Sequence, residues 1–581
     1  MIMHDFGPHR NDDDRLKALF DLVAEAGVTS QELILTKITD AGISAGDGRL
    51  RHVLEKLKSM GDQPIPFENF AAIVRQDLLI INRILRKQLV IPDWPEFCDA
   101  IRQVYNHVAG DRSGSNADYI PILKDADPDK WGVAICSIDG QRFSVGDVDV
   151  YHSIQSVSKP ITYAYALNRE GVKFTHEFVG VEPSGRPFNA LDLLPDMRPF
   201  NPCVNAGAIM VAGVVASGFP DLTAREITQK IMSLWGSLCG DVGEVHFSEE
   251  TMLSEKATAD NNFAIAYLLQ GRKGLPRNVE LHKMIELYLS CCSIEMTAEM
   301  LSVAAATLAN GGVCPLTGEQ VLPTELVKKT LAVMQFAGMY DNAGSFTLEV
   351  GLPAKSGVAG AVMVIIPNLM GFATFSPRLD GFGNSVRGVA FCRELVNRFT
   401  FHVYDSLSGS RSGCKLDPRE SQNNRRQRDL TDLRWALSQG DRYAMKVYEL
   451  VLSSMMEVCL ANGEAEAAEV SVIADTLENL MGMRPPISSL ERELINHQSG
   501  LSKRAGWDTL DALERRLSSE KANLDDNSRE LILESAFRVA CADGEVQGQE
   551  YELLGRIADA LGIYRGVLDI DINRFRKRLS G

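Results

Sequence analysis

Two β-hairpins flank a long helical stretch, and this arrangement constrains the fold more than any other feature of the sequence. Residues 131–146 hold two β-rich runs joined at Asp139-Gly140, and residues 361–377 repeat the pattern around Pro367-Asn368. The roughly 200 residues between them have mostly helical periodicity. A sheet assembled from both ends of one domain predicts an α+β fold, with an antiparallel sheet and a helical cluster. The sequence lacks both βαβ alternation and Walker or G-x-G-x-x-G loops, which argues against a nucleotide-binding sheet.

The chain of 581 residues is too long for one domain. Helical periodicity predicts an all-α, EF-hand-like domain over 1–110, without a complete calcium loop because the acidic ligands and the terminal Glu are missing. The α+β domain is predicted over 119–417, a linker rich in Ser, Gly and charge over 418–429, and a second all-α domain over 430–581.

Charge and composition exclude several classes of protein. The net charge of −17 argues against nucleic acid as a partner, since nucleic-acid binding needs a dense cationic face. No apolar window is long enough to span a membrane, so we expect no membrane partner. The N-terminal residues resemble neither a signal peptide nor a transit peptide. With eleven cysteines and no C-x-x-C, we expect reduced thiols and a cytoplasmic protein.

A serine and a lysine three residues apart stand at a predicted helix start. Positions i and i+3 share a helix face, so Ser156 and Lys159 point the same way. Pro160 is tolerated only in a first turn, which places Ser156 at or just before the helix N-terminus. There its own N–H can hold an oxyanion, and a desolvated Lys159 becomes a plausible base. Taken alone, the motif favours the ordinary interpretation, a serine cap beside a solvated lysine.

A second motif strengthens the catalytic interpretation. Lys355-Ser356-Gly357 follows about 200 residues later, directly before the second hairpin, and S-x-x-K paired with K-T-G occurs in serine β-lactamases and penicillin-binding proteins. Residues from roughly 15 to 417 then resemble the serine-dependent glutaminases, especially the longer kidney-type forms. The stretches that carry this resemblance are ADYIPIL, WGVAICSIDGQR, IQSVSKP, FVGVEPSG, RPFNPCVNAGAI, DNNFAIAYLL, CCSIEMT, TLANGGVCPLTGE, GMYDNAGSF and GLPAKSGVAG.

The resemblance implies a β-lactamase-like catalytic domain that hydrolyses L-glutamine to L-glutamate and ammonia through a γ-glutamyl-serine intermediate. It implies no metal or organic cofactor. The catalytic residues that it implies are Ser156 as nucleophile, Lys159 as base, and Tyr288 and Tyr340, either of which relays a proton. The substrate-binding residues that it implies are Tyr119, Gln155, Ser156, Asn205, Glu255, Asn262, Tyr288, Tyr340 and Val358.

These roles fit the chemistry of a zwitterionic substrate with an amide at its far end. Glu255 supplies the anion that the α-ammonium group needs, and the backbone N–H groups of Ser156 and Val358 form the implied oxyanion hole. Taken singly, each position has an ordinary structural explanation: Asn205 as a cap, Glu255 as a solvated helix charge, and Tyr288 as a core residue. Their arrival together, in family order, favours the functional interpretation.

The resemblance also implies a homotetramer built as a dimer of dimers, and filaments beyond it. One departure concerns regulation: a lysine follows the Phe-Asn pair of the kidney-type loop, whereas residues 185–197 of this chain have Ala190 there. This departure argues against phosphate activation of the kidney type, and the sequence does not identify the activator. Two other classes stay open: another acyl-transfer enzyme of the same fold, such as a β-lactamase or peptidase, and a non-enzymatic scaffold.

The C-terminal domain resembles the TerB-like helical domains associated with tellurite resistance, on the stretch ESAFRVACADGEVQGQEYELLGRIADALGI. Asp543 and Glu545 could be taken for a metal loop. Set at EF-hand positions 1 and 3, however, they place Leu554 at position 12, where a glutamate is needed. We therefore predict no metal there, and interpret Asp543 as a helix N-terminus signal.

Overall fold

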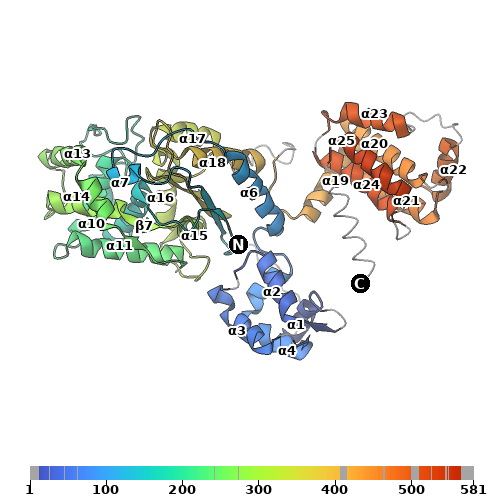
Figure 1. Cartoon of the computed structure of the whole chain (residues 1–581), viewed down its shortest axis with the longest axis horizontal. Coiled ribbons are helices and arrows are strands. Elements are labelled where there is room, and N and C mark those ends of the chain that lie inside the picture. The colour runs from blue at the N-terminus through green and yellow to red at the C-terminus, as the bar shows by residue number, and fades with distance from the viewer. Residues whose placement is uncertain are drawn as a thin grey trace. The chain divides into compact units, whose positions relative to one another are not determined.

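The computed structural model describes residues 12–24, 27–44, 46–61, 63–240, 242–272, 274–405, 415–461, 463, 465–498, 510–524, 526–542, 546 and 548–563, without the side chains of 12, 422–429, 497–498 and 526–527. The chain divides into two compact units, and the division falls between Arg419 and Glu420. Each unit is described by itself, with the elements labelled as in Figure 1.

Short helices around one apolar core form the N-terminal part of the first unit. They are α1 (Asp12–Phe20), α2 (Gln31–Asp40), α3 (Arg51–Met60), α4 (Phe67–Val74) and α5 (Leu78–Leu85), with a two-residue antiparallel pairing of β1 (Val28–Thr29) and β2 (Ile65–Pro66). Ser30 caps α2 by accepting a hydrogen bond from the N–H of Leu33. The buried apolar residues of this core end at Leu89. Apart from this two-residue pairing, the described N-terminal part is helical, as predicted.

Both predicted hairpins are present in one five-stranded antiparallel sheet. Its order is β4-β3-β10-β9-β8, formed by β3 (Gly132–Ser137), β4 (Arg142–Gly146), β8 (Ala354–Ser356), β9 (Ala361–Ile366) and β10 (Met370–Phe375). Every residue of β3, β9 and β10 is buried, which explains their nearly continuous apolar runs. The α+β prediction, with a sheet built from both ends of the domain, is confirmed.

Helices cover both faces of this sheet (Figure 1). On one face α15 (Ala298–Ala309) packs against β3, β9 and β10. On the other face α6 (Trp94–Val108) and α18 (Val386–Arg398) share a core with the sheet. Because Trp94, Phe97 and Ile101 of α6 belong to that core, this helix packs mainly with the sheet, although Trp94 also lies against Gly42 just after α2. We therefore propose a domain boundary between Leu89 and Trp94, in place of 110.

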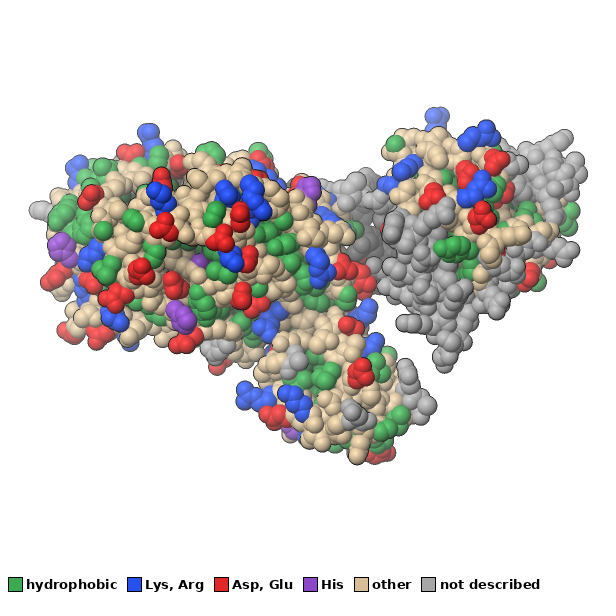
Figure 2. Space-filling view, in the orientation of Figure 1, with side chains coloured by type: hydrophobic (Ala, Val, Ile, Leu, Met, Phe, Trp, Pro, Cys, Tyr) green, Lys and Arg blue, Asp and Glu red, His purple; other side chains and the backbone are tan. Residues whose placement is uncertain are grey.

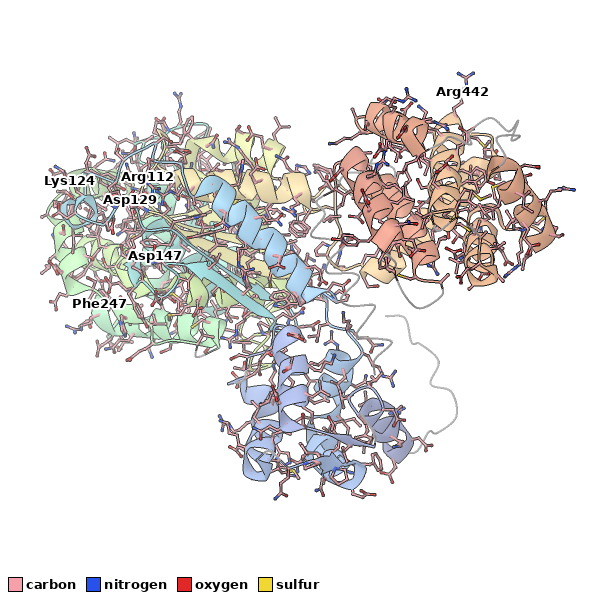
Figure 3. The ribbon with its side chains drawn as sticks, turned by 45° about the vertical axis from the view of Figure 1, so that its right-hand side comes forward. Arg112, Lys124, Asp129, Asp147, Phe247 and Arg442 are labelled. Carbon is pink, nitrogen blue, oxygen red and sulfur yellow. The ribbon has the colours of Figure 1, made fainter. Side chains whose placement is uncertain are left out.

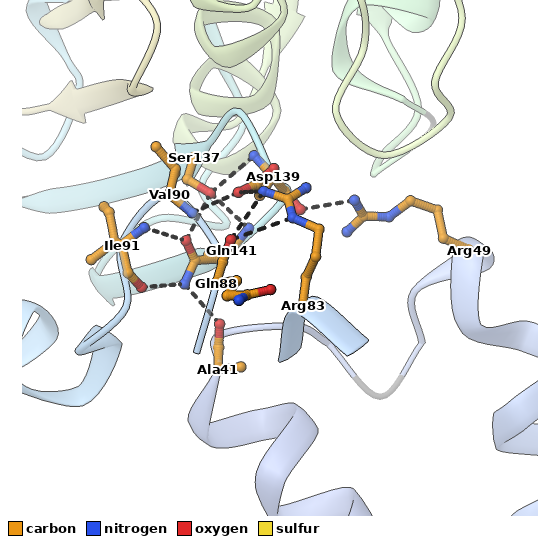
Figure 4. A network of polar contacts seen from close by, with 9 residues as sticks. All are labelled: Ala41, Arg49, Arg83, Gln88, Val90, Ile91, Ser137, Asp139 and Gln141. Atoms are coloured by element: carbon orange, nitrogen blue, oxygen red, sulfur yellow. Dashed lines mark hydrogen bonds and ion pairs between the residues drawn. The ribbon is translucent and has the colours of Figure 1, made fainter. Parts of the chain in front are cut away.

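The turn of the first hairpin is joined to the N-terminal helices by polar contacts, the most buried of which are those of Gln141 (Figure 4). The Gln141 side chain donates to the carbonyls of Ala41 and Ile91, both at 2.9 Å, and accepts from the N–H of Ile91 at 3.2 Å. Asp139 forms an ion pair with Arg83 at 2.6 Å. Gln141 is fully buried. These contacts hold the N-terminal part against the sheet through one short turn.

The helical cluster between the hairpins surrounds a nearly all-buried helix, α10. Its members are α8 (Ser158–Glu170), α9 (Val172–Phe178), α10 (Asn205–Ser217), α11 (Ala224–Cys239), α12 (Glu249–Lys256), α13 (Asp260–Gly271), α14 (Leu281–Cys292), α16 (Thr324–Ala337) and α17 (Ala343–Glu349). A small sheet of order β5-β7-β6, with β5 (His152–Ser153), β6 (His246–Phe247) and β7 (Ile294–Met296), borders the cluster.

Replacing Gly371 with alanine should strongly destabilise this unit. Gly371 lies in β10 directly under α15, and a Cβ there would overlap the backbone of Ala305 and Ala306. We expect a loss of about 3 kcal/mol, since rigid backbone must move. Urea unfolding followed by circular dichroism measures the effect. The matched control is Gly236→Ala in α11, where space is open and alanine should add about 1 kcal/mol. Equal stabilities for the two variants would contradict this packing.

In its described residues the second unit is all-helical, as predicted. It consists of α19 (Gln422–Ser438), α20 (Arg442–Cys459), α21 (Ala467–Met481), α22 (Ile487–Gln498), α23 (Leu510–Glu520), α24 (Asp526–Ala540) and α25 (Gly548–Leu561) around one apolar core. Because α19 begins at Gln422, most of the segment 418–429 is helical and not the linker that we predicted. Asp543 and Glu545 lie outside the described residues. None of the helices in the described parts of the chain has the length and apolarity needed to cross a membrane.

Candidate active site

Ser156 stands at a helix start, as its motif predicts. It lies in a single 3-10 turn, Gln155–Val157, that leads directly into α8, and Pro160 occupies the first turn of that helix. Gln155 has a positive φ of 47°, and its carbonyl accepts a 2.7 Å hydrogen bond from the Ser158 hydroxyl. Ser156 is buried, with 7% of its surface exposed. The local backbone thus holds the serine hydroxyl inside the molecule instead of in solvent.

Lys159 follows one turn later and is almost completely buried. Its Nζ donates to Asn205 Oδ1 at 2.7 Å and to the carbonyl of Cys203 at 3.2 Å. Burial lowers the pKa of Lys159, whereas the nearby Cys292, Cys203 and Glu255 side chains act to raise it. In this structure the amine makes no hydrogen bond to Ser156. The start of α10 therefore orients the lysine, and desolvation favours its neutral form.

Asn205 and Asn262 continue the hydrogen-bonded series that begins at Lys159. Asn205 is the first residue of α10 and sits between Lys159 and Asn262, since its Nδ2 donates to Asn262 Oδ1 at 3.0 Å. Asn262 comes from the first turn of α13 and is half-buried. The interpretation of Asn205 as a simple helix cap does not hold, because its side chain accepts from one site residue and donates to another.

Glu255 contributes a buried carboxyl from the last turn of α12, with 6% of its surface exposed. Its Oε2 accepts a hydrogen bond from Gln155 Nε2 at 3.2 Å. Burial raises the pKa of Glu255 to about 7, while the Gln155 hydrogen bond and the charge of Lys159 act in the opposite direction. A solvated helix charge is therefore excluded. The Glu255 carboxyl therefore has its pKa close to neutral pH, well above that of an ordinary glutamate.

Three tyrosines line the same region. The ring of Tyr288, in α14, has its centroid 6.0 Å from Lys159 Nζ. Burial raises the pKa of Tyr340, and the adjacent Ser156 side chain acts to lower it, although the two hydroxyls are not aligned as a hydrogen bond. Tyr119 is half-exposed, yet desolvation is the largest cause of its raised pKa, followed by Tyr340 and Glu255. The Tyr119 hydroxyl therefore faces the site while its ring borders solvent.

The segment that carries Tyr119 is anchored by a buried arginine of α18. Arg387 donates to the carbonyls of Asp111 and Asp129 at 2.8 and 3.0 Å. Arg112 also forms an ion pair with Asp129 at 3.2 Å, and these two side chains lie together in Figure 3. The segment 111–118, which lies between the first two predicted domains, is therefore held against α18.

Two backbone N–H groups, of Ser156 and of Val358, have no hydrogen-bond partners among the described residues. The two are brought together because β8 ends against the turn that holds Ser156: a Cβ on Gly357 would lie 2.6 Å from the carbonyl oxygen of Ile154. Unpaired buried N–H groups are rare in proteins, so this pair is available to an external oxygen atom.

The loop 185–197 lies over one side of the site. The Phe188 ring packs on Tyr340 with centroids 4.9 Å apart, and the Phe188 carbonyl accepts from the N–H of Asn205 at 2.8 Å. Asn261 donates to the carbonyl of Asn189 at 2.8 Å. The sequence identified this loop but not Phe188 itself.

Sequence reasoning also missed two thiols near the reactive groups. Cys292 and Cys203 both act electrostatically on Lys159, and burial raises the pKa of each thiol. Nothing in the spacing of the eleven cysteines distinguishes these two. Among the described residues, no group of three or more His, Cys, Asp or Glu side chains is arranged to hold a metal ion.

Comparison with known proteins finds three family models that match this chain. The family model described as Glutaminase matches residues 114–404, the one described as Tellurite resistance protein TerB matches 449–569, and an EF-hand domain model matches 13–92. The mouse protein named "Glutaminase liver isoform, mitochondrial" is 38% identical over 467 residues, which cover 78% of this chain and 77% of the relative. "Glutaminase" of Corynebacterium glutamicum is 41% identical over 309 residues, 53% of this chain and 73% of that protein.

A solved structure described as Mglu in its native form has a TM-score of 0.50 and 37% sequence identity, and the match covers 53% of this chain and 74% of that chain. The model match to residues 114–404 includes every predicted site residue, from Tyr119 to Val358. Since that match spans half of the sequence and the mouse relative agrees over most of its length, this chain belongs to the glutaminase family.

Proposed function

We propose that this chain hydrolyses L-glutamine to L-glutamate and ammonia through a γ-glutamyl ester on Ser156. The observation that carries the mechanism is the pair of unpartnered N–H groups, of Ser156 and Val358, beside a buried serine hydroxyl. Such a pair stabilises the oxyanion that develops when a hydroxyl attacks an amide carbonyl.

In the first step, Lys159 accepts the Ser156 proton while the serine oxygen bonds to the δ-carbon of glutamine. The depressed pKa of Lys159 supports this role, because only the neutral amine can take a proton. Asn205 and the Cys203 carbonyl orient the amine. Collapse of the tetrahedral intermediate breaks the C–N bond and releases ammonia once the leaving nitrogen gains a proton.

We assign the proton relay to Tyr340 instead of Tyr288. Tyr340 is the tyrosine whose hydroxyl is influenced by Ser156, whereas Tyr288 presents its ring to Lys159. In the second step, water attacks the ester. The same groups transfer protons in the opposite direction, so that Ser156 regains its proton and glutamate leaves.

The remaining residues bind the amino-acid end of the substrate. Glu255 binds the α-ammonium group of the substrate. This cation would pair with the buried Glu255 carboxyl. We assign Gln155 to holding that carboxylate, since it already donates to it. The groups assigned to the α-carboxylate are Tyr119, Asn205, Asn262 and Tyr288.

This acyl transfer needs protein groups alone, so we propose no metal or organic cofactor. We also propose a cytoplasmic homotetramer, built as a dimer of dimers and able to form filaments, and no nucleic-acid or membrane partner. The proposal of no nucleic-acid partner is supported by Figure 2, in which acidic and basic side chains are interspersed on the visible face of the first unit. The acidic net charge also argues against a nucleic-acid partner.

Ammonia release from glutamine and from asparagine by the full chain tests the reaction. We expect turnover of glutamine and much slower turnover of asparagine, because the shorter side chain leaves its amide short of the Ser156 hydroxyl once the amino-acid end is bound. Acid quenching during turnover, followed by mass spectrometry, should find a γ-glutamyl group on the peptide that contains Ser156. A chain inert to glutamine across a range of phosphate and protein concentrations would instead favour the scaffold or another acyl-transfer substrate.

A further inference from the structure

The backbone that carries Tyr340 has an uncommon conformation. Tyr340 begins a 3-10 turn, Tyr340–Asn342, with a positive φ of 52°. Bulky residues rarely adopt this region, and such a conformation persists only where the surrounding structure imposes it. The two peptide carbonyls that precede Tyr340, of Gly338 and Met339, are the groups through which neighbouring elements can impose it.

A buried lysine holds the first of these carbonyls. Lys355 of β8 donates from Nζ to the carbonyl of Gly338 at 2.9 Å and to that of Ser356 at 2.7 Å. The backbone N–H of Ser356 donates to the same Gly338 carbonyl at 3.2 Å. Lys355 is fully buried, and its Nζ lies 4.2 Å from the centre of the Tyr340 ring. The lysine therefore contacts both the backbone before Tyr340 and the ring itself.

A buried asparagine holds the second carbonyl. Asn384 donates from Nδ2 to the carbonyl of Met339 at 3.3 Å. Its own backbone is fixed, because its N–H donates to Asp380 Oδ1 at 2.9 Å and its carbonyl accepts from the N–H of Asp380 at 2.8 Å. The Asn384 Oδ1 atom has no partner among the described residues. The contact with Met339 is thus the one hydrogen bond that this side-chain amide makes there.

We propose that Lys355 and Asn384 are positioning residues, which hold the carbonyls of Gly338 and Met339 and so keep the Tyr340 hydroxyl next to Ser156. The two side chains approach from different elements, β8 and the segment after β10, and therefore fix the turn from two directions. This inference rests on the proposed role of Tyr340 as proton relay. Neither residue touches the substrate in this scheme.

A double-mutant cycle with Tyr340→Phe tests the proposal. Lys355→Met keeps the shape of the side chain and removes its hydrogen bonds. We expect kcat for glutamine to fall roughly 100-fold, with KM changed less than about threefold, since the displaced group serves the chemical step. In the Tyr340→Phe background the same substitution should cost less than about threefold, because the hydroxyl that it positions is already absent.

Asn384→Ala provides a second, independent cycle. We expect roughly a tenfold loss of kcat in the wild type and little further loss in Tyr340→Phe. If Lys355→Met does not fold, as judged by circular dichroism, the Asn384→Ala cycle decides by the same criterion. Lys328→Met is the control, since that lysine is exposed on α16 and pairs only with Glu325 at the surface. It should leave both constants unchanged.

The outcomes separate the two hypotheses. An inactive wild type would refute the proposed function itself. An active wild type with a fully active Tyr340→Phe, or with losses that multiply in the double variants, would overturn the positioning role and leave glutamine hydrolysis standing. A merely structural role for Lys355 predicts such multiplication, because a loosened core would slow the enzyme whether or not the Tyr340 hydroxyl is present.

Discussion

Ser156→Ala should lower ammonia release from glutamine by at least about 10⁴-fold, with KM and thermal stability little changed. The hydroxyl is the atom that forms the ester, and water bound in its place lacks the alignment that the helix start provides. The serine is small, so its loss leaves the surrounding packing intact. Steady-state ammonia assays with purified full-length protein measure the effect, and Ser233→Ala on α11 is a control far along the chain from the motif.

A related prediction concerns Lys159, the proposed base for Ser156. Lys159→Met should cost about 10³-fold in kcat, since general-base assistance is lost. The double variant should be no worse than Ser156→Ala, because the two groups act as one unit. If the losses of the two single variants multiply, Lys159 serves some other purpose, such as binding the substrate, and the assignment of the base fails.

Glu255→Gln should lower kcat/KM for glutamine by roughly 10²- to 10³-fold, mainly through a higher KM. The variant keeps the shape of the side chain and its contact with Gln155, but it removes the charge that the substrate ammonium needs. Steady-state kinetics measure the change. Glu250→Gln, at an exposed position of the same helix, should leave KM unchanged. An unchanged KM in Glu255→Gln would show that the ammonium group binds elsewhere.

The pH dependence of the same carboxyl gives a second test. Its pKa is raised from 4.5 to about 7, so the free enzyme binds the ammonium group less well as pH falls below about 7, and KM should rise. Protein stability should respond to pH in the opposite way, with the folded chain gaining stability as pH falls. Between pH 4.5 and about 7 the folded chain holds a proton that the unfolded chain has lost, so stability should decrease as pH rises through this window. Glu255→Gln should abolish both contributions.

Local patterns were sufficient for the elements of the catalytic domain. Asp139-Gly140 and Pro367-Asn368 marked two real turns because turn formation depends on a few adjacent residues. Pro160 located the helix start at Ser156 for a similar reason, since a proline excludes the helix interior within one turn. The order of the site motifs along the chain identified the family, although no single spacing was specific enough.

What the sequence alone determined about this protein was therefore its elements, its class and the types of its reactive groups. The tertiary structure alone decided which core each element joins, as with the helix at 94–108, whose apolar face suits either the N-terminal helices or the sheet. It also decided that Asn205 orients Lys159, and that Lys355 and Asn384 reach the carbonyls before Tyr340. Turns and helix starts depend on neighbours in the chain, whereas burial, desolvation and side-chain contacts depend on residues far apart in sequence that only the folded chain brings together.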